Sequence, residues 1–459
     1  MTTDSLFQLL QNEFALSKEQ LEPIIKGFNL ECKKGLKTPS KGLATMIPSY
    51  VTRMPTGRET GTFLSLDLGG TNLRVAAVEL KGNGKSVVHE LKRCPSIELK
   101  TGEGAVFFDW IADAIQELVT IEAAHLFSQS QVLNDEPLSL GVCWSFPVDQ
   151  TAVDRGTILR MGKGFILKNT EGRDLADMFH EAFKRKSMKV KVTAILNDTV
   201  GTLVAHGYTN PACRIGLIFA TGVNAAYPEK VPQITKLDKN VRDKYSIDTE
   251  MLINTEIDIF GTEAYLPLTK YDLALDLSHS QPKFQLYEKM LSGAYLGELT
   301  RLIAMDFIKS GALFGGIIPE GFDQTWSFPT MYMSCLESEE ATYESSLQIL
   351  SDFKFAAVPT LNDIAILTRI CCVVSTRAAS LAAVAIISLI DQQNLFETLQ
   401  DQIVVGINGS TYEFYPGMNL RVRRSLDEWY GKEKSSRITL EVASEGGSVG
   451  GALIAMLCK

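Results

Sequence analysis

The sequence has few cysteines and histidines, and neither residue type forms a pattern. The eight cysteines among 459 residues have no regular spacing, which argues against a disulfide framework or a zinc site and favours a reducing, cytoplasmic location. The five histidines show no spacing typical of metal ligands. The opening segment MTTDSLFQLLQNEF lacks a basic start, a long apolar core and a cleavage site, so we expect no secretory signal.

Positive charge and long apolar runs are also scarce. The net charge of -9, from 45 basic and 54 acidic residues, provides no long-range attraction to nucleic acid or to anionic lipid, and we expect neither as a partner. The most apolar stretch, Ile370–Ile390, contains Arg377, and its uninterrupted part is shorter than the roughly 20 residues that span a bilayer. We therefore predict a buried helix there and no membrane contact.

What is present is an ordinary globular composition, with 45% apolar and 22% charged residues. Short apolar runs that stop at polar or glycine-rich clusters predict strands at Thr62–Leu66, Leu73–Glu79, Ser139–Trp144, Val190–Leu196, Ile215–Phe219 and Ile403–Ile407. Helical spacing predicts helices at Leu6–Lys33, Phe108–Leu126, Leu175–Lys186, Tyr287–Lys309 and Leu361–Ile390. This alternation indicates an α/β fold. No linker or internal repeat divides the chain, so its domains are expected to be discontinuous or subtle.

Three glycine-rich loops follow predicted strands, at Gly69–Asn72, Thr221–Gly222 and Gly406–Ser410, and a fourth glycine cluster lies at Glu445–Gly451. Glycines allow backbone N–H groups to approach phosphate oxygens, and nearby Asp67, Thr71, Arg74 and Thr221 suit a magnesium-bound polyphosphate. A nucleotide site is therefore favoured. The sequence contains no Walker, dinucleotide-binding or protein-kinase signature, which removes the main support for those classes.

The pair Asn197–Asp198 directly follows the predicted strand Val190–Leu196. At that position Asp198 has two possible roles. Its carboxylate can accept a proton from a bound hydroxyl, or it can cap the helix that begins there. The segment alone does not decide between them.

Longer motifs, in order along the chain, resemble one known family. They are Met46–Thr52, Leu66–Val75, Ser145–Pro147 with Gln150, Lys163–Phe165, Leu196–Gly201, Asn254–Glu256, Leu266–Pro267 with Tyr271–Asp272, and Glu288–Leu299. Together they span nearly the whole chain. The sequence resembles the single-unit hexokinases and glucokinases of eukaryotes, of the fungal type, with features similar to fungal N-acetylglucosamine kinases.

The resemblance implies an α/β fold of two actin-like ATPase (ribonuclease H-like) domains, with sugar bound in the cleft between them. We expect residues 60–198 plus 440–459 to form the small domain and residues 1–59 plus 199–439 to form the large domain. Closure of the domains would exclude water, which otherwise competes for the γ-phosphate. A monomer or a homodimer is expected.

The resemblance also implies an ATP-dependent hexose kinase that uses Mg²⁺ and phosphorylates a 6-hydroxyl. Asp198 would deprotonate the hydroxyl, Lys163 would neutralise developing charge, and Asp67 would position the metal through water. The implied sugar-binding residues are Ser145, Phe146, Lys163, Asn197, Asp198, Asn224, Glu256 and Glu288. The implied ATP-binding residues are Asp67, Gly69, Gly70, Thr71, Asn72, Arg74, Thr221, Gly222, Gly406, Gly409, Ser410, Gly447 and Ser448.

Several positions depart from the usual family pattern. Met161–Gly162 replaces Trp-Thr, Ile257–Asp258 replaces Trp-Gly, and Trp144 precedes Ser145, as in fungal N-acetylglucosamine kinases. Less bulk in the pocket would admit an acetyl group, so both a hexose and a 2-acetamido-hexose stay open as substrates.

The phosphate loops differ as well. Ala220 and Val223 replace Gly and Thr, and Asn408 replaces Asp. A third hypothesis follows from these changes: a sugar-sensing regulatory protein with little turnover. The retained Asp198 argues against it.

Overall fold

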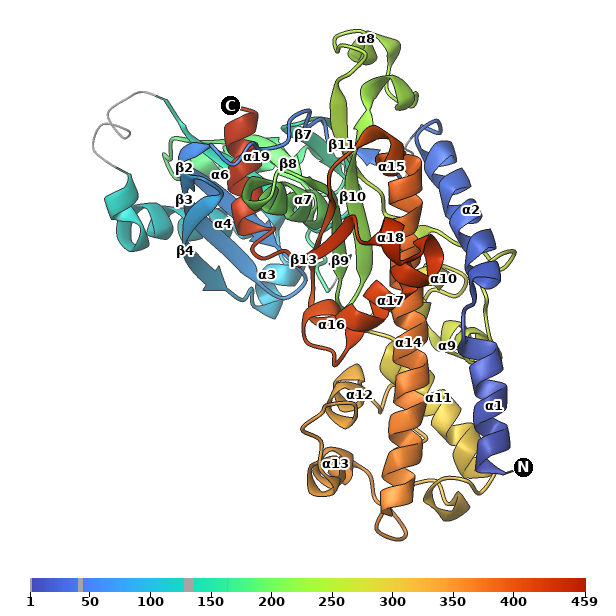
Figure 1. Cartoon of the computed structure of the whole chain (residues 1–459). Helices are drawn as coiled ribbons and strands as arrows, with labels where there is room; N and C mark the ends of the chain where they lie inside the picture. The colour runs from blue at the N-terminus through green and yellow to red at the C-terminus, as the bar shows by residue number, and fades with distance from the viewer. Residues whose placement is uncertain (1, 40–43, 128–135, 163) are drawn as a thin grey trace.

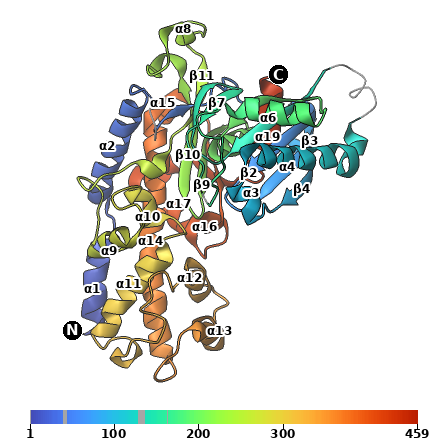
Figure 2. The ribbon, with the colours of Figure 1, turned by 180° about the vertical axis from the view of Figure 1, so that it is seen from behind.

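The computed structural model describes residues 2–39, 44–127, 136–162 and 164–459, so Lys163 lies outside the described residues. The described chain folds around two sheets that lie on opposite sides of the molecule in Figures 1 and 2. One sheet is formed by residues of the expected small domain, and the other, larger sheet lies beside the long helix α14 (Leu361–Gln392). The α/β expectation is therefore confirmed.

The small sheet has the strand order β4-β3-β2-β5-β8. Its strands are β2 (Thr60–Leu68), β3 (Leu73–Gly82), β4 (Lys85–Arg93), β5 (Leu138–Trp144) and β8 (Val190–Leu196). The pairs β2–β3 and β3–β4 are antiparallel, whereas β5 is parallel to both β2 and β8. A separate hairpin joins β6 (Val148–Ala152) to β7 (Arg155–Ile158).

Helices cover both faces of the small sheet because side chains along a strand alternate between its faces. Leu64, Leu66 and Leu68 of β2 pack in one apolar cluster with α4 (Gly104–Glu117) and α6 (Leu175–Arg185). The opposite face packs against α7 (Asp198–Thr209) and α19 (Ser448–Leu457). The small sheet is thus the middle layer of three.

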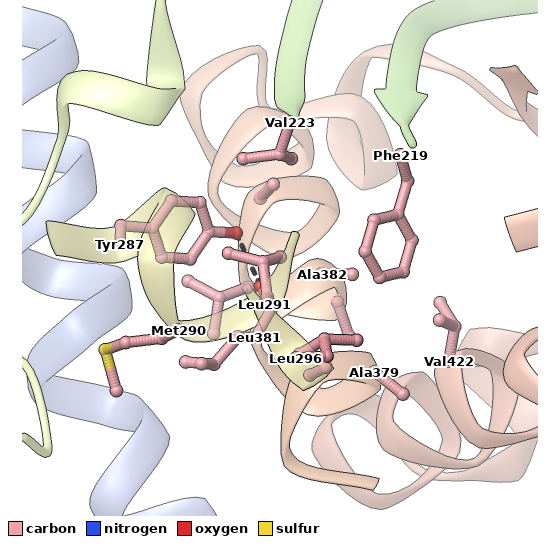
Figure 3. Packing of buried hydrophobic residues seen from close by; sticks show 14 of the residues in the cluster. Phe219, Val223, Tyr287, Met290, Leu291, Leu296, Ala379, Leu381, Ala382 and Val422 are labelled. Atoms are coloured by element: carbon pink, nitrogen blue, oxygen red, sulfur yellow. Dashed lines mark hydrogen bonds between the residues drawn. The ribbon is translucent and has the colours of Figure 1, made fainter. Parts of the chain in front are cut away.

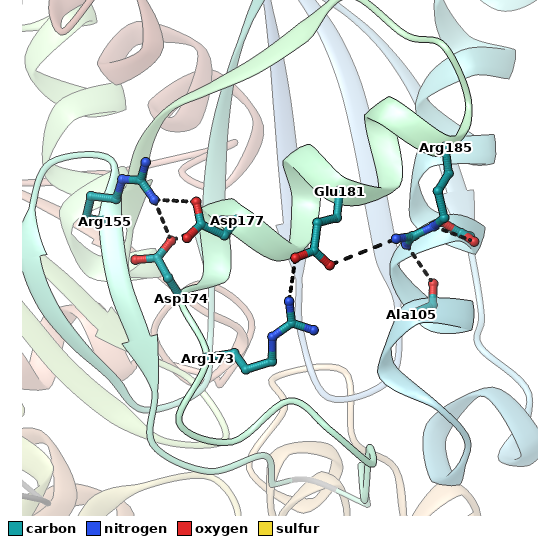
Figure 4. Close-up of polar contacts among 8 residues, drawn as sticks. Ala105, Arg155, Arg173, Asp174, Asp177, Glu181 and Arg185 are labelled. Atoms are coloured by element: carbon teal, nitrogen blue, oxygen red, sulfur yellow. Dashed lines mark hydrogen bonds and ion pairs between the residues drawn. The ribbon is translucent and has the colours of Figure 1, made fainter.

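Exposed ion pairs attach α6 to its surroundings, as Figure 4 shows. Arg185 donates from Nε to Asp109 Oδ1 of α4 at 2.9 Å, and Arg173 donates from Nη2 to Glu181 Oε1 at 2.6 Å. Arg155 of β7 contacts Asp174, which caps α6. Such exposed pairs contribute at most about 1 kcal/mol each, so the apolar layer beneath them holds α6 in place.

The large sheet has the order β1-β11-β10-β9-β12-β13. Its strands are β1 (Ile47–Pro48), β9 (Cys213–Phe219), β10 (Val223–Lys230), β11 (Glu250–Asn254), β12 (Ile403–Asn408) and β13 (Ile438–Val442). The strands β11, β10 and β9 are antiparallel, and β12 and β13 continue in parallel from β9. Apart from β1, this repeats the pattern of the small sheet, and both agree with the expected actin-like ATPase fold.

Helix α7 packs on the large sheet, which also shares an apolar cluster with several further helices. They are α1 (Thr3–Phe14), α2 (Lys18–Gly35), α9 (Lys270–Ser278), α10 (Leu286–Leu291), α11 (Leu296–Lys309), α14 and α17 (Met418–Tyr430). Shorter helices are α3 (Ile97–Thr101), α8 (Lys239–Arg242), α12 (Thr330–Leu336), α13 (Tyr343–Ile349), α15 (Leu395–Thr398), α16 (Ser410–Glu413) and α18 (Lys432–Ser435).

Helix α14 is the centre of this core. It is long and apolar enough to cross a membrane by composition, but 78% of its most apolar window is buried inside the protein. Every side chain from Leu381 to Ile390 is at most 1% exposed. Figure 3 shows Leu381 and Ala382 among Phe219, Val223 and Leu291, with Tyr287 Oη donating to the Leu381 carbonyl at 2.6 Å. The prediction of a buried core helix is confirmed.

Three predicted helices are too long. The predicted helix Leu6–Lys33 is interrupted between α1 and α2, where Ser17 caps the second helix. The predicted helix Tyr287–Lys309 is interrupted between α10 and α11, because the N–H groups of Gly293 and Ala294 donate to the carbonyls of Ala220 and Thr221 instead of continuing a helix. The predicted helix Phe108–Leu126 is regular only to Glu117 and then widens into a π-turn at Leu118–Glu122.

The two sheets are joined through α7 and α19. Helix α7 follows β8 of the small sheet and packs on β9 of the large sheet. Its Gly201 meets Gly450 of α19, where an added Cβ on Gly450 would lie 2.3 Å from the Gly201 carbonyl oxygen. The backbones therefore touch directly. The predicted domain boundaries stay a prediction, and β13, which pairs with β12 of the large sheet, spans the proposed boundary at residue 440.

The buried pair of Arg377 on α14 and Asp272 on α9 generates a stability prediction. Arg377 donates to both Asp272 oxygens, at 2.8 and 2.6 Å, and the side chains are 0% and 3% exposed. We expect Arg377→Ala to lower the free energy of unfolding by about 3–5 kcal/mol, because it leaves a buried carboxylate uncompensated. Denaturant titration measures this. The control Arg424→Ala, from an exposed pair, should lose less than about 1 kcal/mol, and equal losses would contradict the prediction.

Candidate active site

Two of the four glycine-rich loops are hairpin turns at equivalent places in the two sheets. Residues Gly69–Asn72 connect β2 to β3, and Ala220–Gly222 connect β9 to β10. In the first turn the Gly69 N–H donates to the Asn72 carbonyl at 3.1 Å, and in the second the Ala220 N–H donates to the Gly222 carbonyl at 2.9 Å. Thr71 and Thr221 are exposed at the two turns.

The loop before α19 lies against Asp67 at the end of β2. Ser65 Oγ donates to the Gly447 carbonyl at 2.9 Å, and a Cβ on Gly447 would lie 2.6 Å from Asp67 Oδ2. Ser448, the first residue of α19, is 6% exposed. The positive end of the α19 dipole therefore lies beside the Asp67 carboxylate and the Gly69–Asn72 turn, which suits a bound anion.

The loop after β12 lies against the second hairpin turn. Gly409 adopts φ +136°, and a Cβ on it would lie 2.7 Å from the Cβ of Ala220. Thr411 Oγ1 donates to the Ala220 carbonyl at 2.8 Å, and Ser410 is exposed beside this contact. The four loops thus meet as two pairs: the Gly69–Asn72 turn lies with the loop that follows β13, and the Ala220–Gly222 turn lies with the loop after β12.

Two predicted ATP-binding residues lie inside strands. Gly406 is inside β12, not in a loop, and a Cβ on it would lie 2.8 Å from His206 of α7. Its smallness therefore allows α7 to approach the sheet, and an ATP contact at Gly406 stays a prediction. Arg74 is exposed within β3, where it pairs in register with Asp67.

Asn197, rather than Asp198, is the cap of α7. Its Oδ1 accepts from the Thr199 N–H at 2.8 Å, and Asp198 is the first residue of the helix. The suggestion that Asp198 is the cap is therefore wrong. The Asp198 carboxylate lies at the positive end of the helix dipole and is partly exposed. It is also close enough to Glu256 to raise the pKa of that residue.

Amide groups from adjacent strands surround Glu256, which has a left-handed backbone with φ 49°. Asn254 Nδ2 donates to Glu256 Oε1 at 2.6 Å, and Asn224 Nδ2 donates to the same oxygen at 3.2 Å and to Asn254 Oδ1 at 2.9 Å. Thr199 Oγ1 approaches Asn254 Oδ1 at 3.4 Å and so connects α7 to this cluster. Carboxylate and amide groups in this arrangement can hydrogen-bond the hydroxyls of a sugar.

Glu288 connects this cluster to the second hairpin turn. Its Oε2 accepts from the Val223 N–H at 3.0 Å, and a Cβ on Gly222 would lie 2.7 Å from the same oxygen. The Val223 side chain is 2% exposed and lies in the core shown in Figure 3. The family pattern has Thr where this chain has Val223, so the missing hydroxyl is missing from a buried position. The backbone of the turn still donates a hydrogen bond to Glu288.

Asn408 makes a contact that aspartate cannot make. Its Nδ2 donates to the Ala443 carbonyl at 2.6 Å and connects the end of β12 to the segment after β13. A carboxylate there has no hydrogen to donate. The replacement of Asp by Asn is thus accommodated by a specific hydrogen bond.

Ser145, one of the predicted sugar-binding residues, lies next to the Gly69–Asn72 turn. Its N–H is 3.3 Å from the Leu68 carbonyl. Phe146 is 6% exposed, and its ring packs against Trp144 and Phe165 in the core, so its contact with sugar stays a prediction. Lys163 lies outside the described residues.

Two polar residues that were not predicted as ligands join the carboxylate cluster. Asp258 is 7% exposed, and its Oδ2 accepts from Gln285 Nε2 at 2.5 Å, whereas its Oδ1 has no hydrogen-bond partner among the residues that the structure describes. The sequence signalled Asp258 only as a departure from the family pattern, and nothing in the spacing pointed to Gln285.

Lys100 was also not predicted as a site residue. Its Nζ donates to the Gly70 carbonyl at 3.2 Å, so it contacts the Gly69–Asn72 turn.

The clustering of carboxylates changes their acidity. Burial, followed by the charge of Asp258, raises the pKa of Glu256 well above its ordinary value, although the Asn254 and Asn224 amides oppose the shift. Burial and the charge of Glu288 likewise raise the pKa of Asp258. These groups therefore hold protons more tightly than isolated carboxyl groups do.

Comparison with known proteins decides the family. Two hexokinase family models match residues 7–208 and 214–457. The chain belongs to the hexokinase family. Hexokinase-1 of Schizosaccharomyces pombe is 34% identical over 450 residues, which cover 98% of this chain and 90% of the relative. Hexokinase of Schistosoma mansoni is 34% identical over 452 residues, which cover 97% of this chain and 95% of the relative.

Solved hexokinase structures share the fold. The Schistosoma mansoni hexokinase complexed with glucose matches with a TM-score of 0.80 at 31% identity, and 100% of each chain is covered. A second crystal structure of a hexokinase matches with a TM-score of 0.82 at 28% identity over 99% of each chain. The chain is thus a sugar kinase, an ATP-dependent hexose kinase of the two-domain actin-like fold. These comparisons do not favour the N-acetylglucosamine alternative.

The raised pKa values predict how stability depends on pH. A carboxyl group whose pKa is higher in the folded state binds more protons when folded, so the free energy of unfolding falls as pH rises from about 4.5 past neutrality. We expect Asp258→Asn to raise the free energy of unfolding at pH 8 by about 1–3 kcal/mol and to flatten this decline. Denaturant titrations from pH 5 to about pH 8 measure both. The exposed control Asp243→Asn should leave the slope unchanged, and an unaltered slope in Asp258→Asn would refute the assignment.

Proposed function

We propose that this chain transfers the γ-phosphate of ATP to the 6-hydroxyl of a glucose-type aldohexose. One observation carries the proposal: the first turn of α7 contacts both halves of the site. Asp198, the first residue of the helix, lies beside the cluster of Asn224, Asn254 and Glu256, and the end of the same turn touches the loop before α19. Gly201 of that turn approaches the Gly446 carbonyl so closely that an added Cβ would lie 2.5 Å from it. A proton acceptor therefore lies between a polyol-binding cluster and an anion-binding loop.

In the proposed mechanism Asp198 orients the sugar hydroxyl and accepts its proton as that oxygen attacks phosphorus. Glu256, Glu288, Asn224 and the amide of Asn197 hold the other hydroxyls. Because each sugar hydroxyl both donates and accepts, a site that alternates carboxylates with amides suits it better than carboxylates alone. Lys163 is proposed to neutralise charge on the transferred group.

We propose that ATP binds along the two loop pairs. Backbone N–H groups of Gly69–Asn72 and Thr221–Gly222 hold the phosphates, and the nucleoside lies near Gly409–Ser410 and Gly447–Ser448. The N-terminus of α19 adds a favourable field for the phosphates.

Asp67 is proposed to hold Mg²⁺ through water. The described residues contain no group of three or more potential metal ligands, which fits Mg²⁺ because this ion commonly binds through one or two carboxylates, water and substrate phosphates. Bound Mg²⁺ supplies positive charge that neutralises the phosphate oxygens. The expectations of a cytoplasmic location and of a monomer or homodimer stay predictions.

The test is ADP release from Mg-ATP, with glucose, mannose, fructose and N-acetylglucosamine compared side by side. We expect turnover on the simple hexoses and a loss of about 10²–10⁴-fold in kcat for Asp198→Ala, because the proton acceptor is removed. The exposed control Asp243→Ala should retain full activity. Thermal unfolding confirms that each variant folds.

Other outcomes separate the alternatives. Turnover confined to N-acetylglucosamine would reassign the substrate. Sugar binding without turnover in the unaltered chain would favour the regulatory hypothesis. Unchanged kcat in a folded Asp198→Ala variant would remove Asp198 from the proton-acceptor role.

A further inference from the structure

Two short helical segments carry two of the carboxylates that are proposed to bind sugar. The 3-10 turn η4 (Ile257–Ile259) begins directly after Glu256. Helix α10 begins directly after Gln285 and contains Glu288 in its first turn. The two segments contact each other. Glu256 and Glu288 therefore reach the site on separate pieces of chain, and their spacing depends on how η4 and α10 are held together.

One side-chain hydrogen bond joins these segments. Asp258 Oδ2, in η4, accepts from Gln285 Nε2, at the start of α10, at 2.5 Å. Asp258 lies two residues after Glu256, and Gln285 lies three residues before Glu288. The usual family pattern has glycine at the position of Asp258, and glycine has no side chain to accept this bond. The contact is therefore a departure of this chain from that pattern.

The backbone on both sides of the bond is in a disfavoured conformation. Glu256 has φ 49° and Gln285 has φ 54°, both in the left-handed region. Residues with a Cβ seldom adopt this region, and they remain there where the surrounding contacts hold them. The bond between Asp258 and Gln285 is one such contact, because it links the segment after Glu256 to the residue before α10.

The same bond requires an unfavourable charge in the interior. Asp258 is 7% exposed, and its Oδ1 is buried without a hydrogen-bond partner among the described residues. Burial, followed by the charge of Glu288, raises the pKa of Asp258, and the charge of Asp258 in turn raises the pKa of Glu256. Asp258 therefore lowers the stability of the folded chain at neutral pH. Destabilising groups of this kind are typical of functional sites.

We propose that Asp258 and Gln285 are positioning residues for the sugar: their hydrogen bond sets the spacing at which Glu256 and Glu288 contact one sugar molecule. The inference rests on the proposed sugar-binding function of those two carboxylates. Neither positioning residue has to touch the reacting atoms. Their loss weakens the binding of sugar equally in the ground state and in the transition state, which raises KM and leaves kcat unchanged.

Steady-state kinetics with glucose at saturating Mg-ATP test the proposal. We expect Asp258→Ala and Gln285→Ala each to raise the KM for glucose about tenfold while kcat stays within about twofold. The double variant should be no worse than either single variant, because each substitution removes the same contact. Calorimetric titration with glucose gives the affinity without relying on turnover.

Two further variants separate positioning from a merely structural role. Asp258→Asn keeps an oxygen that accepts from Gln285, so its KM should stay within about twofold of that of the unaltered chain. Asp363 is a matched control away from the site: it is 9% exposed and accepts from the Phe314 N–H at 2.7 Å. Asp363→Ala should lower the stability and leave the KM unchanged, whereas Asp258→Ala should raise the KM without lowering the stability. Denaturant titration measures the stability of each variant.

Glu256→Gln distinguishes failure of this inference from failure of the proposed function. If Glu256→Gln binds glucose normally, the sugar-binding role of the cluster is wrong, and the positioning role is wrong with it. If Glu256→Gln loses affinity but Asp258→Ala and Gln285→Ala keep it, the positioning role alone is refuted. Losses that multiply in the double variant, or a loss confined to kcat, would also overturn the inference.

Discussion

The direct backbone contact between α7 and α19 is the constraint on which the rest of the site depends. Each helix follows the last strand of one sheet, and glycines at positions 201 and 450 allow the two backbones to touch where any Cβ would collide. This crossing lies within one turn of both helix N-termini. It therefore fixes Asp198, which follows the last strand of the small sheet, near the loop before Ser448, which follows the last strand of the large sheet. A larger residue at either glycine would separate the proposed proton acceptor from the proposed phosphate-binding loop.

The electrostatics of the site follow from that geometry. Two helix N-termini supply partial positive charge where phosphate is expected, while the carboxylates of Glu256, Asp258 and Glu288 gather on the large-domain side. This carboxylate cluster repels anions but suits a neutral molecule whose hydroxyls donate hydrogen bonds to the carboxylates. In the proposed site, this separation of positive and negative charge would orient a sugar and a polyphosphate relative to each other.

Much of this arrangement could be predicted from the sequence, since strands such as Val190–Leu196 show clear apolar runs and the ordered motifs identify the family. The rest depends on tertiary contacts. Strand β10 contains Pro228, which argues locally against a strand, yet it pairs on both sides over part of its length. The break between α10 and α11 exists because Gly293 bonds a distant turn. Gly406 looked like part of a ligand loop, but only the position of α7 reveals its packing role. The shared topology of the two sheets left no repeat in the sequence.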